Sequence, residues 1–208
     1  MAELLVFDFD GTLVDSIGSV WAEFQNVMET MDLEKVTRAE FNRHVGRSWD
    51  DVIRSLWRGI DPAEFTRHYN IRAEKASLFE GEEEALKKLS KGHTLAIMTG
   101  RGRETLYNHI RAASLDLSLF KAVYHKNNLE YPKPDPRSLE QVCRELGFEP
   151  SDSVYVGDSI VDAECSSKAG VGFIGVLSGG TSREEFSEWG VTDTIRDVTE
   201  LPAHPLVI

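Results

Sequence analysis

The sequence has few of the residues and patterns on which several classes of protein depend. Only Cys143 and Cys165 are cysteines, so neither a disulfide framework nor a thiolate metal site is indicated. No apolar run approaches the length that crosses a bilayer, which argues against a membrane span. The amino terminus lacks a basic leader, and with two free cysteines this predicts a reducing, cytoplasmic location.

Basic residues are also in the minority. Lys and Arg number 23 against 35 Asp and Glu, which gives a formal net charge of −12. Binding to nucleic acid or to an anionic membrane is therefore disfavoured, because phosphate contacts need clustered cations. If the substrate is an anion, a metal ion and a few placed cations must reverse the sign of the charge locally. A monomer is the simplest expectation, and a weak dimer is left open.

What the sequence does contain is an alternation of short apolar runs with helical patterns. The first run, residues 4–9, ends at Asp10-Gly11-Thr12 and is typical of a buried parallel strand. Further strands are expected at 93–98, 122–124, 153–156 and 172–176, with helices at 82–90, 103–113, 136–146 and 160–169. This order predicts an α/β fold with a Rossmann-like three-layer α/β/α core and a parallel sheet.

The stretch after the first strand breaks this alternation. It holds three or four helical segments in succession and no convincing strand, and Ser16 is placed to cap the first helix. The simplest account is a small all-helical domain, residues 15–80, inserted into a core domain made of residues 1–14 and 81–208.

Polar residues gather where the predicted strands end. Asp8 and Asp10 end the first strand, and because side chains two residues apart on a strand point the same way, both can reach one site. Later strand ends carry Thr99-Gly100, Lys133, and Asp158 followed by Asp162. The carboxyl ends of parallel strands share one edge of a sheet. This edge would then hold metal-binding carboxylates, a nucleophile, donors to phosphate oxygens and a cation.

In these four strand-end motifs, taken in order, the chain resembles the haloacid dehalogenase-like superfamily. The likeness is greatest to small phosphatases of its phosphoglycolate phosphatase and β-phosphoglucomutase-like branch, and it covers essentially the whole chain. The helical insert resembles the cap domain of that superfamily in its helical version. The resemblance implies a magnesium-dependent phosphatase that acts on a small phosphorylated metabolite through an aspartyl phosphate. The substrate is left open among phosphoglycolate, pyrophosphate, sugar phosphates and nucleotides.

The resemblance also implies catalytic and metal-binding residues. Asp8 would be the nucleophile, and Asp10 the general acid and then the base that activates water. Magnesium would bind the carboxylates of Asp8 and Asp158 and the backbone carbonyl of Asp10. Asp162 would support these ligands or act as an auxiliary one, although an acid that simply favours a helix amino terminus explains it equally well.

Substrate-binding residues follow from the same resemblance. Thr99, the amide of Gly100 and Lys133 would hold the phosphoryl group. Arg47 looks like part of the cap loop that faces the active site, where it would grip the remote end of the substrate; an exposed arginine before a helix is an equal alternative. Arg101 is expected to lie in a solvated loop rather than in the site.

Two other functions remain open on the sequence alone. A sugar phosphomutase of the β-phosphoglucomutase type would use the same covalent chemistry, but the mutases of this branch carry a cap-hinge histidine where Val20 stands here. A phospho-acceptor signalling domain of the receiver type also uses aspartate, a hydroxyl residue, lysine and magnesium. Its acceptor, however, sits on a middle strand and no helical cap interrupts its fold.

Overall fold

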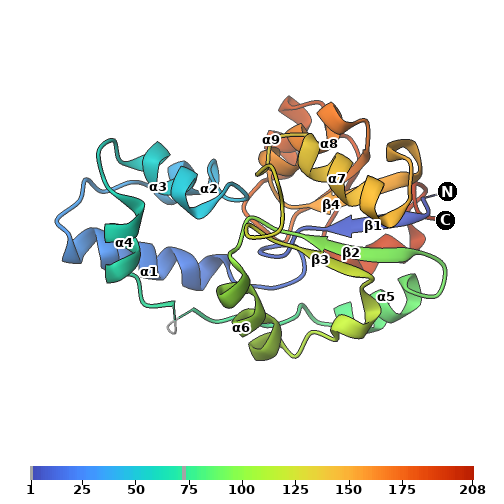
Figure 1. Ribbon diagram of the computed structural model, residues 1–208, viewed down its shortest axis with the longest axis horizontal. Helices are drawn as coiled ribbons and strands as arrows, with labels where there is room; N and C mark the ends of the chain where they lie inside the picture. The colour runs from blue at the N-terminus through green and yellow to red at the C-terminus, as the bar shows by residue number, and fades with distance from the viewer. Residues whose placement is uncertain (1, 72–73) are drawn as a thin grey trace.

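A six-stranded sheet forms the centre of the molecule. The computed structural model describes residues 2–71 and 74–208, and within them the sheet is parallel throughout, in the order β3-β2-β1-β4-β5-β6 (Figure 1). The strands are β1 (Leu4–Phe7), β2 (Thr94–Met98), β3 (Ala122–Tyr124), β4 (Ser153–Gly157), β5 (Gly172–Val176) and β6 (Thr194–Ile195). The first strand therefore lies in the middle of the sheet, between β2 and β4.

Helices cover both faces of this sheet. Leu5 and Phe7 belong to the apolar cluster that includes α5 (Glu82–Leu89) and α6 (Arg103–Ala113). Leu4 and Val6 belong to the cluster on the other face, with α7 (Arg137–Leu146) and α8 (Ile160–Ala169). The alternation along β1 follows from the two-residue period of a strand, and because both faces are buried the strand is apolar on both.

Shorter elements complete the core. They are α9 (Arg183–Glu188) and three 3₁₀ turns, η2 (Leu117–Leu119), η3 (Pro150–Asp152) and η4 (Val198–Ala203). The last of these packs against α5 through Val198 and Leu201, which belong to the same apolar cluster as that helix.

The helical insert stands to one side of the sheet, beyond the carboxyl ends of its strands (Figure 1). It consists of α1 (Ile17–Thr30), α2 (Arg38–Asn42), α3 (Trp49–Leu56) and α4 (Pro62–His68). Its own apolar cluster is centred on Phe24, whose ring lies 4.7 Å from that of Phe41 and 5.1 Å from that of Phe65. Such aromatic contacts give the insert a core separate from the two beside the sheet.

The predicted fold class is confirmed, including the three layers and the helical insert after the first strand. Of the strands, β3 and β5 have the predicted bounds, while β1 ends two residues early, at Phe7. The two-residue β6 was not predicted, because it is shorter than any apolar pattern can show. The division of the chain at residues 14 and 81 stays a prediction. Along the described part of the chain, the helices are too short or too polar to cross a bilayer.

Candidate active site

Backbone pairing beyond the strand ends fixes the first site residues. The amide of Asp8 donates to the carbonyl of Val156 on β4 at 2.9 Å, and the amide of Thr99 donates to the carbonyl of Tyr124 on β3 at 3.0 Å. Both side chains are therefore held at the same edge of the sheet, where open α/β folds bind their ligands. Asp8 and Thr99 are buried, at 3% and 2% exposure, so their orientation is set by packing.

Lys133 lies beneath Asp8 and joins three polar side chains. Its ammonium is 2.9 Å from Asp8 Oδ1 and 2.7 Å from Asp162 Oδ1, and it donates to the Tyr155 hydroxyl at 3.0 Å. Burial alone would lower the pKa of Lys133, but the charges of Asp162 and Asp8 and their hydrogen bonds raise it above its ordinary value. The lysine is therefore a fixed positive charge under the first strand end.

Asp162 is fully occupied by partners of its own. Its Oδ1 also accepts from the Tyr155 hydroxyl at 2.8 Å, and its Oδ2 accepts from the backbone amide and hydroxyl of Ser159. The latter contacts form a capping box at the start of α8. Asp162 thus holds Lys133 and caps α8 at the same time. Its contacts fit the acid expected at a helix amino terminus, and its role in supporting the metal ligands stays a prediction.

Three buried carboxylates converge near this point. Asp8, Asp158 and Asp162 each offer an oxygen within 4.8 Å of the others. Burial and the neighbouring charges of Asp8 and Asp162 raise the pKa of Asp158 well above its ordinary value. Burial likewise raises the pKa of Asp8 to about 7, against the opposing charge of Lys133. One lysine does not neutralise three acids, so the cluster favours a further cation.

One oxygen of Asp158 is available to such a cation. Its Oδ2 accepts from the Gly180 amide at 3.0 Å, whereas Oδ1 is buried and has no hydrogen-bond partner among the described residues. A buried oxygen without a partner is costly, and a hard divalent ion prefers such carboxylate ligands. Gly11, at φ +75°, lies so close that an added Cβ would meet Asp158 Oδ2 at 2.6 Å, so the turn after β1 holds that carboxylate in place.

The expectation that Arg101 lies in a solvated loop is wrong. Its side chain is 12% exposed and binds Asp10 through two hydrogen bonds, Nε to Oδ2 at 2.6 Å and Nη2 to Oδ1 at 2.8 Å. Ser16 occupies the cap position of α1, but its hydroxyl donates to Asp10 Oδ1 instead of capping the helix. Burial would raise the pKa of Asp10, and Arg101 and Ser16 together lower it below its ordinary value.

Arg101 also contacts the segment that returns from the insert to the core. Its Nη1 lies 2.9 Å from Glu74 Oε2, and His109 Nε2 on α6 lies 2.8 Å from the same oxygen. The Tyr69 hydroxyl, from the end of α4, donates to the other oxygen of Glu74. Burial would raise the pKa of Glu74, but the hydrogen bond from His109 and the charge of Arg101 lower it. A chain of polar contacts thus links Asp10 to the insert.

The loop between α2 and α3, with the ends of these two helices, makes a second contact between the insert and the core. An added Cβ at Gly100 would lie 2.8 Å from the backbone carbonyl of Arg47, so only glycine lets the loop come this close. Asn42 donates to the Gly180 carbonyl at 3.2 Å, and Lys126 lies 3.0 Å from Asp50. The insert therefore closes over the strand ends in this structure.

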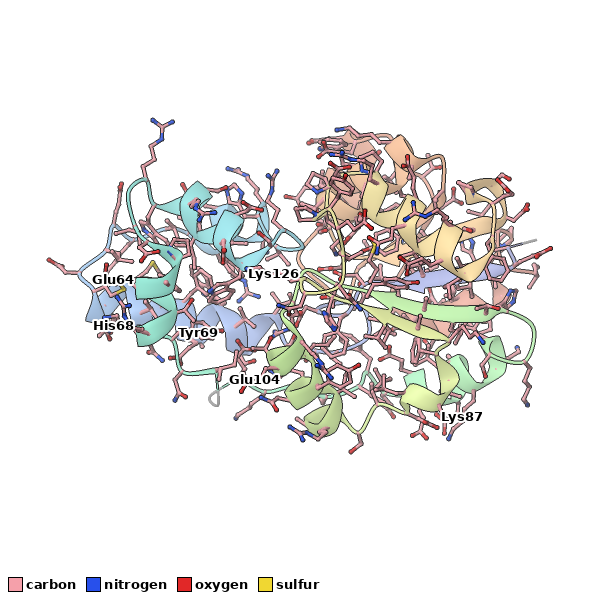
Figure 2. All side chains as sticks on the ribbon, viewed as in Figure 1. Glu64, His68, Tyr69, Lys87, Glu104 and Lys126 are labelled. Atoms are coloured by element: carbon pink, nitrogen blue, oxygen red, sulfur yellow. The ribbon has the colours of Figure 1, made fainter. Side chains whose placement is uncertain are left out.

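A cavity of about 510 Å³ lies between insert and core. Asp8, Asp10, Thr99, Gly100 and Arg47 all line it, whereas Lys133, Asp158 and Asp162 lie beneath its floor and contact Asp8 or one another. The Arg47 Nε is buried and has no hydrogen-bond partner within the described part of the chain. Figure 2 labels three further lining residues, which are Tyr69 from the insert and Glu104 and Lys126 from the core.

Comparison with known proteins now decides the family. Residues 5–176 match the model of a family described as haloacid dehalogenase-like hydrolase. The chain belongs to this family. Membership agrees with the strand-end motifs, the helical insert and the buried acid cluster, and it confirms the resemblance seen in the sequence.

Relatives of this haloacid dehalogenase-like hydrolase carry different names. A phosphoglycolate phosphatase from Mesorhizobium japonicum is 30% identical over 194 residues, covering 86% of this chain and 85% of its own. The pyrophosphatase PpaX of Halalkalibacterium halodurans is 28% identical over 176 residues, covering 80% of each chain. A Bacteroides fragilis crystal structure described as a haloacid dehalogenase-like hydrolase superposes with a TM-score of 0.84 at 26% identity, covering 97% of this hydrolase and 100% of that chain.

Sequence reasoning missed the network around Arg101. Arg101 follows the Thr99-Gly100 motif by one residue and could have been placed at the same sheet edge for that reason. Glu74 and His109 offered no such signal, because neither stands at a strand end or in a recognisable spacing. Tyr155 was read only as part of an apolar strand, and its hydroxyl beneath the site is visible only in the structure.

Proposed function

We propose that this haloacid dehalogenase-like hydrolase is a magnesium-dependent phosphatase of a small phosphorylated metabolite, which transfers the phosphoryl group to Asp8 and then hydrolyses it. The observation that carries the proposal is the Asp8 carboxylate at the floor of the cavity between insert and core, 2.9 Å from a buried lysine and near an Asp158 oxygen that has no partner among the described residues. The names of the relatives support phosphate esters or anhydrides as the substrate class.

The residues present fit a magnesium ion. Asp8 and Asp158 would hold it with their carboxylates and Asp10 with its backbone carbonyl, since the orphaned Asp158 oxygen and the raised pKa of both acids favour a cation between them. A bound ion of this kind supplies charge neutralisation to the phosphoryl oxygens and the attacking carboxylate.

The nucleophile and the phosphoryl group are positioned by the chain itself. Lys133 fixes Asp8 Oδ1, which leaves Oδ2 free of that contact to attack phosphorus. As the oxygen–phosphorus bond of the leaving group breaks, the Thr99 hydroxyl and the Gly100 amide would donate to the transferred group, and Lys133 would add its positive charge from beneath the floor. Arg47, which lines the cavity from the insert, would bind the remote end of the substrate.

Asp10 would move the protons. It donates one to the departing oxygen and then accepts one from the water that attacks the aspartyl phosphate. In this structure Arg101 and Ser16 take up both of its oxygens. Both contacts favour the ionised carboxyl, so release of the Arg101 contact would let Asp10 hold the proton that it donates.

The two alternative functions are less well supported. A mutase must return the phosphoryl group to a sugar with the help of a cap histidine, and here Val20 lines the cavity with an apolar side chain that moves no proton. A receiver domain has no cavity of this size closed by a helical insert. Hydrolysis is the simpler outcome, because water suffices to complete it.

Release of inorganic phosphate with Asp8→Asn as the test variant examines the proposal directly. With magnesium and a panel of phosphorylated metabolites, we expect the wild type to turn over many times and Asp8→Asn to lose at least about a thousandfold in kcat. Asp32→Asn, an exposed change beyond α1, is the matched control and should keep full turnover. Undiminished activity of Asp8→Asn would refute the proposed nucleophile.

A further inference from the structure

We infer that the substrate carries an apolar body, branched aliphatic or aromatic, on the far side of its phosphorylated oxygen. This inference rests on the proposed phosphatase function and names the class of ester that the enzyme selects. It concerns the half of the cavity formed by the insert, which the phosphoryl chemistry does not use.

The cavity is larger than a phosphoryl group requires. At about 510 Å³ it lies in the range of sites that enclose ligands of drug size. A phosphoryl group occupies roughly 100 Å³ at most, on the scale of about 30 Å³ for each water molecule. Most of the space is therefore left for the group attached to the phosphate. A bare anion such as pyrophosphate or phosphoglycolate would leave much of it unfilled.

The insert side of this remaining space is mostly apolar, whereas the core side carries Glu104, Thr105 and Asn108. The insert contributes aliphatic and aromatic side chains from three helices and the segments beside them; these lining residues are Val20, Phe24, Phe41, Val45, Val52 and Ile71. Five of the six also belong to the apolar cluster of the insert and are at most 9% exposed, so the surface that they turn towards the cavity is small and firmly packed. Contact with such a surface favours carbon over hydroxyl or carboxylate, because each methylene removed from water strengthens binding about fourfold.

The polar groups of the same wall are already paired with one another. Trp49 Nε1 donates to the Thr66 hydroxyl at 2.9 Å, and that hydroxyl donates to the Pro62 carbonyl at 2.7 Å. The Tyr69 hydroxyl donates to Glu74. A sugar or a second carboxylate placed here would lose its hydrogen bonds to water and find few in return.

The cations that line the cavity do not offer a free charge to the far end of the substrate either. Arg101 is held by Asp10 and Glu74, and Lys126 lies 3.0 Å from Asp50. Arg47 has an unpaired Nε, but its backbone carbonyl packs on Gly100, next to the phosphoryl end of the site. Among the described residues, the lining cations other than Arg47 are thus already paired with acids.

Two phosphate esters with similar leaving groups test the inference. In 3-methylbutyl phosphate and glycerol 3-phosphate, primary alcohols depart in both cases, so a difference in kcat/KM reports contact with the wall. We expect the wild type to prefer 3-methylbutyl phosphate by at least about tenfold, and to prefer it over phosphoglycolate and pyrophosphate as well. Acetyl phosphate, which is too small to reach the wall, measures the phosphoryl chemistry alone.

A pair of isosteric variants locates the preference. Val52→Thr puts a hydroxyl on the wall, whereas Val27→Thr makes the same change in the insert core away from the cavity. The ratio of kcat/KM between the two esters should fall at least about fivefold in Val52→Thr and stay at the wild-type value in Val27→Thr.

The outcomes separate this inference from the proposed function. If acetyl phosphate is hydrolysed in an Asp8-dependent way but glycerol 3-phosphate, phosphoglycolate or pyrophosphate is used as well as the apolar ester, the apolar substrate class is wrong and the phosphatase stands. An unchanged ester ratio in Val52→Thr also overturns the inference. If the enzyme releases phosphate from none of these compounds, acetyl phosphate included, the proposed function fails and the inference with it.

Discussion

Arg101 bridges two acids that come from different parts of the chain. Asp10 follows the first strand, whereas Glu74 lies on the segment that returns from the insert, and the guanidinium binds both within 2.9 Å. A planar fork of donors can hold two carboxylates in one geometry, which a lysine ammonium does not do. The residue thus couples the proposed proton carrier to the position of the insert.

Arg101→Lys keeps the charge but removes this fork, so we expect kcat to fall on the order of tenfold or more while the fold is retained. Steady-state kinetics with acetyl phosphate would measure the loss. Arg103→Lys, an exposed change two residues further on, serves as the control and should leave kcat within about twofold. Equal kinetics for both variants would show that the arginine fork has no part in turnover.

Among the elements, the loop between α2 and α3 decides how closely the insert approaches the sheet. Its backbone at Gly46 and Arg47 packs directly on the strand-end loops that carry Gly100 and Ser159. With this contact made, the insert lies over the floor of the cavity, where Asp8 is 3% exposed. Closure therefore depends on small residues at the contact rather than on a large interface.

Gly100→Ala should hold the insert away from the core. The added methyl would lie 2.8 Å from the Arg47 carbonyl, and because backbone cannot give way easily, we expect kcat/KM to fall at least about tenfold. Gly102→Ala is a matched control, since the nearest atom to its added Cβ is 3.7 Å away. The measurement is kcat/KM of both variants on one substrate. A fully active Gly100→Ala would show that the insert does not need this close contact with the core.

Glu82, the first residue of α5, makes the stability of the protein depend on pH. It is buried, accepts from the Phe79 amide at 3.0 Å, and burial raises its pKa from 4.5 to about 8. Between these values the folded state keeps a proton that the unfolded state has released. Its contribution to the free energy of unfolding is therefore fully favourable below about pH 4.5 and declines as the pH rises to about 8.

Glu82→Gln should remove this decline. Urea unfolding between pH 5 and 8 should show a flatter pH dependence in the variant than in the wild type, with a gain of a few kcal/mol at pH 8. Glu84→Gln changes an exposed acid of the same helix turn and should follow the wild-type curve. Parallel curves for the wild type and Glu82→Gln would mean that Glu82 keeps an ordinary pKa in the folded protein.

For the molecule as a whole, negative charge dominates, with a formal net charge of −12. Three of its acids are packed within 4.8 Å of one another at the strand ends, where burial prevents water from screening them. In the proposed function, a metal ion bound by these carboxylates would offset the repulsion. Stability should therefore respond to divalent cations more than to salt.

Magnesium at a hundredfold excess over its dissociation constant should raise the free energy of unfolding by about 2.7 kcal/mol, which corresponds to a Tm increase of about 5 °C or more. Chelation should reverse the shift. Asp158→Asn should unfold at a higher temperature than the wild type without magnesium and should lose the magnesium response. Potassium chloride at equal ionic strength is the control, and an equal rise with it would argue against a specific metal site.

The site residues at the strand ends could be predicted from the sequence, whereas the side chains that contact them could not. Asp8, Thr99, Lys133 and Asp158 were found because each follows an apolar strand pattern, and parallel strands bring their ends to one edge whatever the rest of the chain does. Such placement needs only local pattern and topology. The proposed roles of these residues, and that of Arg47, stay predictions.

Contacts made by side chains from unpatterned segments could not be predicted. Glu74 lies 27 positions before Arg101, between α4 and α5, where the sequence shows no helix or strand pattern, and Ser16 has the sequence position of an ordinary helix cap. Whether such a side chain turns towards the site depends on how the insert packs on the core, which no local propensity encodes. The apolar wall of the cavity was hidden for the same reason, because its residues read as core.

The chain leaves the core for the insert and comes back at almost the same point. Asp15 and Ser77 form an antiparallel bridge, with the Asp15 amide donating to the Ser77 carbonyl at 2.9 Å. A foreign segment whose ends lie one hydrogen bond apart could therefore be grafted between these two residues without moving any strand. One continuous piece of the gene therefore encodes the whole insert, and a graft would have to supply anew the contacts that Ser16 and Glu74 make with Asp10 and Arg101.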